Sequence, residues 1–272
     1  MLPGFLLALR EGIEVALVLG ILLGALRKLH RPDLSLSLWL GVLAAVFTSL
    51  LFAFGLQRAG ASLEGASEAV FEGITMLLAA ALLTWMIFWM QRQSRHLRGR
   101  IEENVRRAAG TAGRWSIFGV AFLSVVRDGI ELALFVTALE FSTSQGQTLL
   151  GVVLGLAASV MFGWLLFTST RRLPLQRFFQ VTNILLILFA AGLVAHGVHE
   201  FVEVGWIPAV VDPVYNINFL LNSDTGLGQL LKALFGYNGS PSLPETLAYL
   251  VYFLILVFSL TDFQRRTTVK TA

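Results

Sequence analysis

Residues 4–19 read GFLLALREGIEVALVL, and residues 121–136 read AFLSVVRDGIELALFV. The two stretches are identical at eight of 16 positions, and their charged residues carry the match. Both lie in the middle of a long apolar segment, where an ionisable side chain costs about 2.5–3.5 kcal/mol on membrane-insertion scales. The pair therefore predicts a repeated membrane segment with a function at its centre.

The composition of the whole chain also indicates a membrane protein. Of the 272 residues, 56% are hydrophobic and 14% are charged, whereas a soluble domain carries about 25% charged residues. The chain has no cysteine, which excludes disulfides and thiolate metal sites. The basic residues lie in loops beside apolar segments, so we interpret the pI of 9.6 as membrane topology and not as nucleic-acid binding.

The hydropathy pattern predicts an all-α polytopic membrane protein. A spanning helix needs about 20 mostly apolar residues, and we expect seven, at 2–26, 36–57, 69–91, 115–140, 146–169, 178–200 and 246–262. Of the 20 basic residues, 16 follow the first, third or fifth segment or lie in the C-terminal tail. The positive-inside rule then places the N-terminus outside and the C-terminus inside. The basic segment 92–114 is expected to be a helix on the cytoplasmic surface.

The two similar stretches lie three spans apart, so they cross the membrane in opposite directions. We expect one permease domain over residues 1–272, built as an inverted repeat. Transporters of this kind commonly bind substrate near the membrane midplane, where the repeats meet. The predicted parts are repeat one at 1–92, repeat two at 115–200, an outside loop at 201–245 and helix seven at 246–262.

Each repeat places one arginine and two acids on neighbouring helix turns. Arg10 and Glu14 are four residues apart, as are Arg127 and Glu131, so each pair can meet on one helix face. Gly12 and Gly129 are expected to let the two helices approach closely. The predicted ligands at the midplane are Glu11, Glu14, Asp128 and Glu131.

Four carboxylates without thiols form an oxygen site, which suits hard cations such as Mg²⁺, Ca²⁺, Mn²⁺ and Fe³⁺. Arg10 and Arg127 would support the site by holding the acids and limiting their negative charge. The alternative is that the Arg–Glu pairs only bind helices together. Crowded carboxylates can exchange protons for metal, so a proton-driven mechanism stays open.

Two further groups lie at the predicted outer surface. Glu68 and Glu72 lead into the third span and are expected to form an acidic funnel, with Glu72 also a metal contact. A second cluster lies on one helix face at the end of the sixth span. Its expected metal contacts are His196, His199 and Glu200, and Glu203 is expected to be a further acid of the funnel. Met86 and Met90, beside Trp85 and Trp89, are interpreted as core or lipid contacts.

The two Arg-acid-Gly-Ile-Glu motifs resemble the paired Arg-Glu-x-x-Glu motifs of the high-affinity iron permease family, also called oxidase-dependent iron transporters. The likeness extends to His196-Gly197-Val198-His199-Glu200 with Gly205, and to Leu234-Phe235-Gly236-Tyr237. Asp128 stands where the first motif has Glu11, which shortens that acid by one methylene.

The resemblance implies an iron importer of the plasma membrane, of the bacterial ferrous iron permease type, in which Glu11, Glu14 and Glu131 translocate iron. Family members work beside a multicopper ferroxidase in fungi, or beside periplasmic iron-binding and haem-peroxidase proteins in bacteria. The expected contacts are iron ions and membrane lipid, in the bacterial inner membrane. No resident cofactor is expected, because iron is the transported substrate.

Three other functions compete with iron import. A carrier for another hard divalent cation, such as Mn²⁺, would use the same carboxylates. A non-transporting metal sensor would usually carry a signalling domain. An intramembrane enzyme would need a nucleophile with a base or a closed catalytic metal site, and the sequence has no evident Ser–His or Cys–His arrangement. We therefore expect a transporter and not an enzyme.

Overall fold

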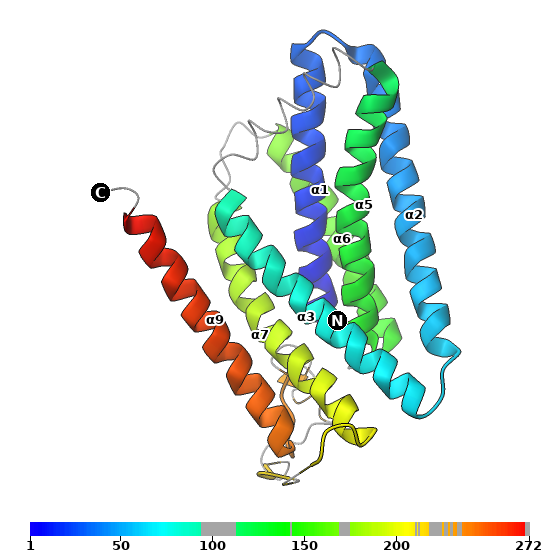
Figure 1. The fold of residues 1–272 in the computed structure, drawn as a ribbon. Coiled ribbons are helices and arrows are strands. Elements are labelled where there is room, and N and C mark those ends of the chain that lie inside the picture. Colours follow the sequence, from blue (N-terminus) through cyan, green and yellow to red (C-terminus); the bar gives the residue numbers. More distant parts are fainter. Residues whose placement is uncertain are drawn as a thin grey trace. The chain divides into compact units, whose positions relative to one another are not determined.

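The computed structural model describes residues 1–93, 113–141, 143–168, 175–209, 213–217 and 236–269, with a few single residues between 211 and 232. All regular structure in these ranges is helical (Figure 1). Each of the seven predicted segments coincides with one α-helix, so the helix positions are confirmed. The elements are α1 (Leu2–Lys28), the 3₁₀ turn η1 (Pro32–Leu34), α2 (Ser35–Ala61), α3 (Ala66–Gln93), α5 (Gly113–Glu140), α6 (Gln145–Thr168), α7 (Leu175–Glu203) and α9 (Leu243–Val269).

Four of the described helices are long and apolar enough to cross a membrane. They cover Pro32–Ala61, Ala66–Trp89, Gln145–Leu165 and Val181–Glu203. Helices α1 and α5 have 27 and 28 residues, but the motif charges interrupt their apolar character. Helix α9 is apolar over Leu243–Ser259. Most of the predicted surface helix 92–114 lies outside the described residues.

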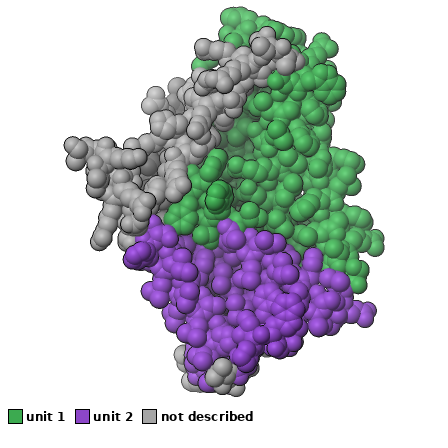
Figure 2. Space-filling view, viewed as in Figure 1, with its two compact units in different colours: residues 1–62, 82–184 green, residues 63–81, 185–272 purple. Residues whose placement is uncertain are grey.

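The chain forms two compact units, coloured separately in Figure 2. Unit 1 comprises Met1–Ser62 and Leu82–Ile184, and unit 2 comprises Leu63–Ala81 and Leu185–Ala272. Helices α3 and α7 each contribute to both units. Both sequence motifs belong to unit 1, whereas the predicted outer clusters belong to unit 2.

Helix pairs from distant parts of the sequence build unit 1. Helix α1 packs mainly on α6, α2 packs mainly on α5, and α1 also touches α5 (Figure 1). On α2, Gly41 faces Phe118 near the start of α5, and further along Ser49 faces Gly129. The second contact involves later residues than the first on both helices. Helices α2 and α5 therefore run in the same direction.

Glycines bring these paired helices close to backbone contact. A Cβ atom on Gly41 would lie 2.5 Å from the carbonyl oxygen of Phe118, and one on Gly155 of α6 would lie 2.5 Å from that of Phe5 in α1. Small residues allow such close approach in membrane helix packing, where van der Waals contact replaces the hydrophobic drive.

One end of unit 1 is closed by an apolar core. Leu22 and Leu26 near the end of α1 pack with Leu34 of η1, with Leu38 near the start of α2 and with Ile117 near the start of α5. All five side chains are buried. The end of α1 thus meets the start of α5, so these two motif helices run in opposite directions.

In unit 2, glycines again mark the helix contacts. Gly73 of α3 and Gly197 of α7 face each other, since a Cβ on Gly73 would lie 3.0 Å from the Gly197 carbonyl oxygen. Gly236, just before α9, has a φ of 65° and its missing side chain leaves room for the backbone of Gly192 in α7. Only glycine meets both demands at position 236 without strain.

We predict that Gly41→Ala destabilises the protein, whereas Gly55→Ala on the same helix does not. The added methyl meets backbone at position 41, and overpacking typically costs about 1–3 kcal/mol. At position 55 it meets nothing within 4 Å. Thermal unfolding of both purified variants in detergent tests this, and equal unfolding temperatures would contradict the close α2–α5 contact.

Candidate metal centre

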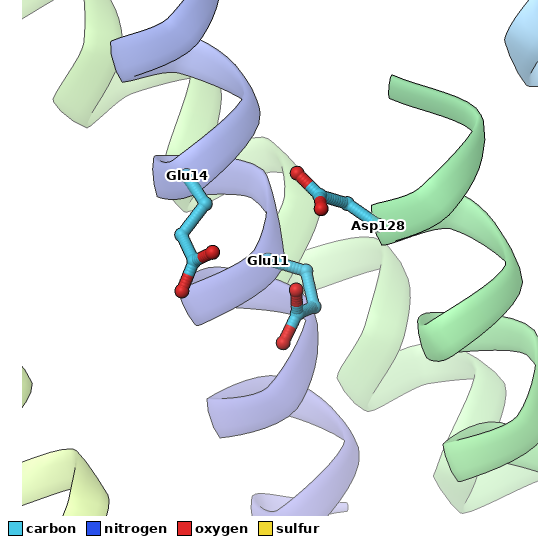
Figure 3. A group of neighbouring side chains, drawn as sticks. All are labelled: Glu11, Glu14 and Asp128. Atoms are coloured by element: carbon cyan, nitrogen blue, oxygen red, sulfur yellow. The ribbon is translucent and has the colours of Figure 1, made fainter. Parts of the chain in front are cut away.

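Three acids from two helices form the centre of unit 1. Glu11 and Glu14 leave α1, and Asp128 leaves α5 towards them (Figure 3). Each offers a carboxylate oxygen within 4.8 Å of the others. Glu11 and Asp128 are buried, with exposed fractions of 2% and 4%, and Glu14 is nearly so. This spacing fits one shared cation.

Arg10 neutralises part of this negative charge from within α1. Its Nη1 donates to Glu11 Oε1 at 2.6 Å, and its Nη2 lies 2.9 Å from Glu14 Oε1. The Arg10 side chain is completely buried. Breaking a buried ion pair by removing one partner is strongly destabilising. The stability of unit 1 therefore depends on the pairing of Arg10 with these acids.

The second motif repeats the pairing with looser geometry. Arg127 Nε lies 3.3 Å from both Asp128 Oδ1 and Glu131 Oε1. The Arg127 side chain is 46% exposed, in contrast to the buried Arg10. The two motifs, here called half-sites, therefore differ in two ways. The second has Asp128 where the first has Glu11, and its arginine is much more exposed.

The fourth predicted ligand, Glu131, lies outside the group of three. It interacts electrostatically with Glu14 and is held by Arg127 instead. Among the described residues, Glu11 Oε2 and Glu131 Oε2 are buried oxygens without a hydrogen-bond partner. Buried carboxylate oxygens usually have partners, so these two atoms are available to a ligand.

The motif glycines contact other helices than predicted. Gly12 faces Ser159 of α6, and Gly129 faces Ser49 of α2. The expectation that these glycines bring α1 and α5 together is wrong. At 3.6 residues per turn, Gly12 and Glu14 point about 160° apart around the helix axis. When Glu14 faces α5, Gly12 therefore lies on the opposite side of α1, towards α6.

Helix α3 supplies two contacts that the sequence analysis missed. Met86 Sδ lies 2.6 Å from Arg10 Nη1, and the Trp89 ring lies under Arg127 at 4.7 Å from the guanidinium carbon to the ring centroid. These residues are three apart and share a helix face. Met86 and Trp89 therefore hold the two motif arginines and are more than general core or lipid contacts.

The predicted outer groups lie together in unit 2. Glu72 interacts electrostatically with Glu68, Glu200 and Glu203, so the acids of α3 and α7 face a common region. Glu68 and Glu203 are exposed, and Glu72 and Glu200 are half-buried. His196 Nδ1 lies 3.0 Å from the Gly192 carbonyl oxygen, which turns that nitrogen to its own helix.

Glu245 organises this region, although the sequence analysis did not single it out. The carboxylate is 4% exposed and lies 2.9 Å from His199 Nδ1 and 2.9 Å from Asn238 Nδ2. It also accepts hydrogen bonds from the Ser242 amide and hydroxyl. The bond from the Ser242 amide is the acid's half of a capping box at the start of α9, a pattern that Ser-x-x-Glu before an apolar run predicts.

Comparison with known proteins identifies the family of this chain. Residues 1–263 match the profile of the iron permease FTR1 family. The chain belongs to this family. It is 31% identical over 253 residues to the ferrous iron permease EfeU of Escherichia coli O6:K15:H31 and to that of Shigella sonnei, covering 92% of this chain and 91% of each relative. The Yersinia pestis ferrous iron permease EfeU is 29% identical over 262 residues, covering 93% of this chain and 92% of the relative.

No solved structure matches the chain significantly. Membership of an iron permease family, together with several helices able to cross a membrane, identifies a multi-pass membrane protein that transports iron ions. The family resemblance seen in the two motifs is thereby confirmed. In this iron permease, both motifs lie in unit 1, where three of their acids converge.

We predict that Arg10→Ala destabilises the permease by about 3–5 kcal/mol, the usual cost of leaving a buried charge without its partner. Arg127→Ala should cost less, because Arg127 is half exposed and its ion pairs are longer, at 3.3 Å. Thermal unfolding in detergent compares the two variants. A larger effect of Arg127→Ala would contradict the inequality of the half-sites.

A separate prediction concerns Glu245 in unit 2. Glu245→Ala should increase amide hydrogen exchange at residues 242–246, because the capping box at the start of α9 loses its acid. Hydrogen-exchange mass spectrometry measures this directly, with Glu64→Ala, at an exposed position, as the control. Unchanged exchange in the Glu245 variant would mean that other contacts hold the start of α9.

Proposed function

We propose that this permease imports iron through the carboxylate group of Glu11, Glu14 and Asp128. The observation that supports this most strongly is the convergence of three poorly solvated acids within 4.8 Å. Carboxylates at this distance repel one another, and low solvation strengthens the repulsion. A bound cation relieves it, and in an iron permease that cation is the transported iron.

The charge of the two motifs favours a divalent ion. Four acids and two arginines leave a formal charge of −2, which one divalent cation balances. Manganese carries the same charge and accepts the same oxygen ligands, so charge does not choose between the metals. The relatives are named ferrous iron permeases, and we therefore propose Fe²⁺ as the transported form.

Glu131 is proposed as the next carboxylate that iron meets. Its Oε2 is buried without a hydrogen-bond partner in the described part of the chain, and it lies on the same helix as Asp128, one turn further along. The Arg127 side chain that holds it is half exposed. This ion pair is less enclosed than that of Arg10, so an arriving cation can compete for Glu131.

The inverted repeat is part of the proposal, and matching helix contacts support it. When residues 4–19 are aligned with residues 121–136, Gly12 corresponds to Gly129 and Phe5 to Phe122. Gly12 meets Ser159 of α6 as Gly129 meets Ser49 of α2. Gly151 of α6 lies against the Phe5 amide as Gly41 of α2 lies against the Phe122 amide.

These contacts pair each motif helix with the second helix of the other repeat. The α1–α6 and α2–α5 pairs share glycine-rich, closely packed interfaces. In the proposed cycle, each pair moves as a unit and the acids between α1 and α5 open to one side at a time. Rocking of one helix bundle against another around a fixed site is the usual mechanism in inverted-repeat transporters.

The proposed orientation places the N-terminus outside and the C-terminus in the cytoplasm of a bacterial cell, across the inner membrane. The cluster of Glu72, His196, His199 and Glu200 would then meet iron on the outer side, with Glu68 and Glu203 attracting cations to it. A ferroxidase, or periplasmic iron-binding and haem-peroxidase proteins, would deliver iron on that side.

We predict that proteoliposomes containing only this permease take up radiolabelled Fe²⁺ kept under reductant. Glu14→Gln and Asp128→Asn should each lower uptake at least about tenfold, the scale on which metal sites respond to lost polar partners. Both changes remove charge while keeping side-chain size. Glu64→Gln, at an exposed acid, is the matched control and should import normally.

Normal uptake by both site variants would disprove the carboxylate site while leaving the permease intact. Absence of uptake by folded wild-type protein would point to a required partner or another ion. Manganese competition and chelated Fe³⁺, tested on the same vesicles, separate those explanations.

A further inference from the structure

A methionine sulfur lies beside the motif charges in unit 1. Met86 of α3 is 3% exposed, and its Sδ lies 2.6 Å from Arg10 Nη1. The same nitrogen lies 2.6 Å from Glu11 Oε1. One guanidinium nitrogen is thus held between a carboxylate oxygen and a thioether sulfur, next to the three converging acids.

We propose that Met86 is a metal ligand that makes the permease selective for ferrous iron over harder cations. This inference rests on the proposed transport through Glu11, Glu14 and Asp128. Arg10 Nη1 occupies a position from which a positive charge contacts Glu11 Oε1 and Met86 Sδ together. A metal ion that takes this position binds both atoms and gains a sulfur ligand.

The charge of the incoming ion explains how the Arg10 guanidinium is displaced from Glu11. Without metal, the guanidinium balances Glu11 and Glu14. A divalent cation among the same acids repels the guanidinium and competes for Glu11. Arg10 has a long side chain and a second acid partner in Glu14, so the whole guanidinium can turn away from Glu11 towards Glu14.

The thioether supplies a discrimination that carboxylates lack. Oxygen ligands suit Mg²⁺, Ca²⁺ and Mn²⁺, whereas thioether sulfur is a soft ligand. Fe²⁺ also stands above Mn²⁺ in the affinity order of divalent metals. A mixed oxygen and sulfur site therefore favours Fe²⁺ over Mg²⁺, Ca²⁺ and Mn²⁺, and it disfavours the harder Fe³⁺.

Met86→Leu tests the proposal, because leucine keeps a similar volume and removes the sulfur. Met76→Leu is the matched control, since Met76 is also buried in α3, with 1% exposed, but belongs to unit 2. Proteoliposomes with each protein take up radiolabelled Fe²⁺ while Mg²⁺, Mn²⁺ or the soft ion Cd²⁺ competes. Met86→Leu should import Fe²⁺ with lower apparent affinity, with inhibition by Cd²⁺ weakened about tenfold and inhibition by Mg²⁺ and Mn²⁺ strengthened.

A spectroscopic measurement decides the same question without transport. Because the chain has no cysteine, a sulfur neighbour of bound metal can come only from methionine. X-ray absorption of the purified wild-type protein loaded with Fe²⁺, and separately with Cd²⁺, should detect one sulfur neighbour beside oxygens. This neighbour should persist in Met76→Leu and disappear in Met86→Leu.

Wild-type ion selectivity in Met86→Leu, or an all-oxygen metal environment in the wild-type protein, would overturn the role of Met86. Iron uptake by wild-type vesicles would leave the proposed function standing in that event. Absence of wild-type uptake would count against the proposed function instead. If Met86→Leu fails to fold, the spectrum of the wild-type protein still decides, with a sulfur neighbour supporting the proposal and its absence refuting it.

Discussion

The completely buried charge of Arg10 is the constraint on which unit 1 depends. Water cannot solvate this guanidinium, so protein groups must, and the pairing with Glu11 and Glu14 does so within a single helix turn. The pairing leaves one negative charge in excess, to which Asp128 adds as it approaches from α5. An apolar helix bundle retains such groups at a cost, which a cation-transport function explains.

Close helix packing makes the convergence of acids geometrically possible. Glycines at the α1–α6 and α2–α5 contacts remove side chains that would push the helices apart. The two motif helices are then placed by their respective partners, and their acids face each other between the pairs. The serines opposite Gly12 and Gly129 fill the small space that remains, so the geometry of the acids depends on residues that never touch a metal.

The two half-sites use similar residues in different surroundings. Arg10 is enclosed with Met86 as a neighbour, whereas Arg127 is half exposed above Trp89. In the proposed transport cycle, this difference would let one half-site hold iron more tightly than the other. In unit 2, the capping residue Glu245 joins α9 to His199 of α7, so a residue that starts one helix also orients a histidine on another.

The sequence by itself determined the seven helices, the two motifs and the pairing of Arg10 with Glu14, because hydropathy and i,i+4 spacing act within one segment. It also contained the Ser-x-x-Glu signal of Glu245, which was overlooked. Only the tertiary structure decided that Glu131 lies outside the group of three acids, that Gly12 faces α6, and that Met86 contacts Arg10. These facts depend on which helix lies against each face. Apolar helices in a membrane present similar surfaces to many neighbours, so the choice is made by the packing of the whole unit and not by any local pattern.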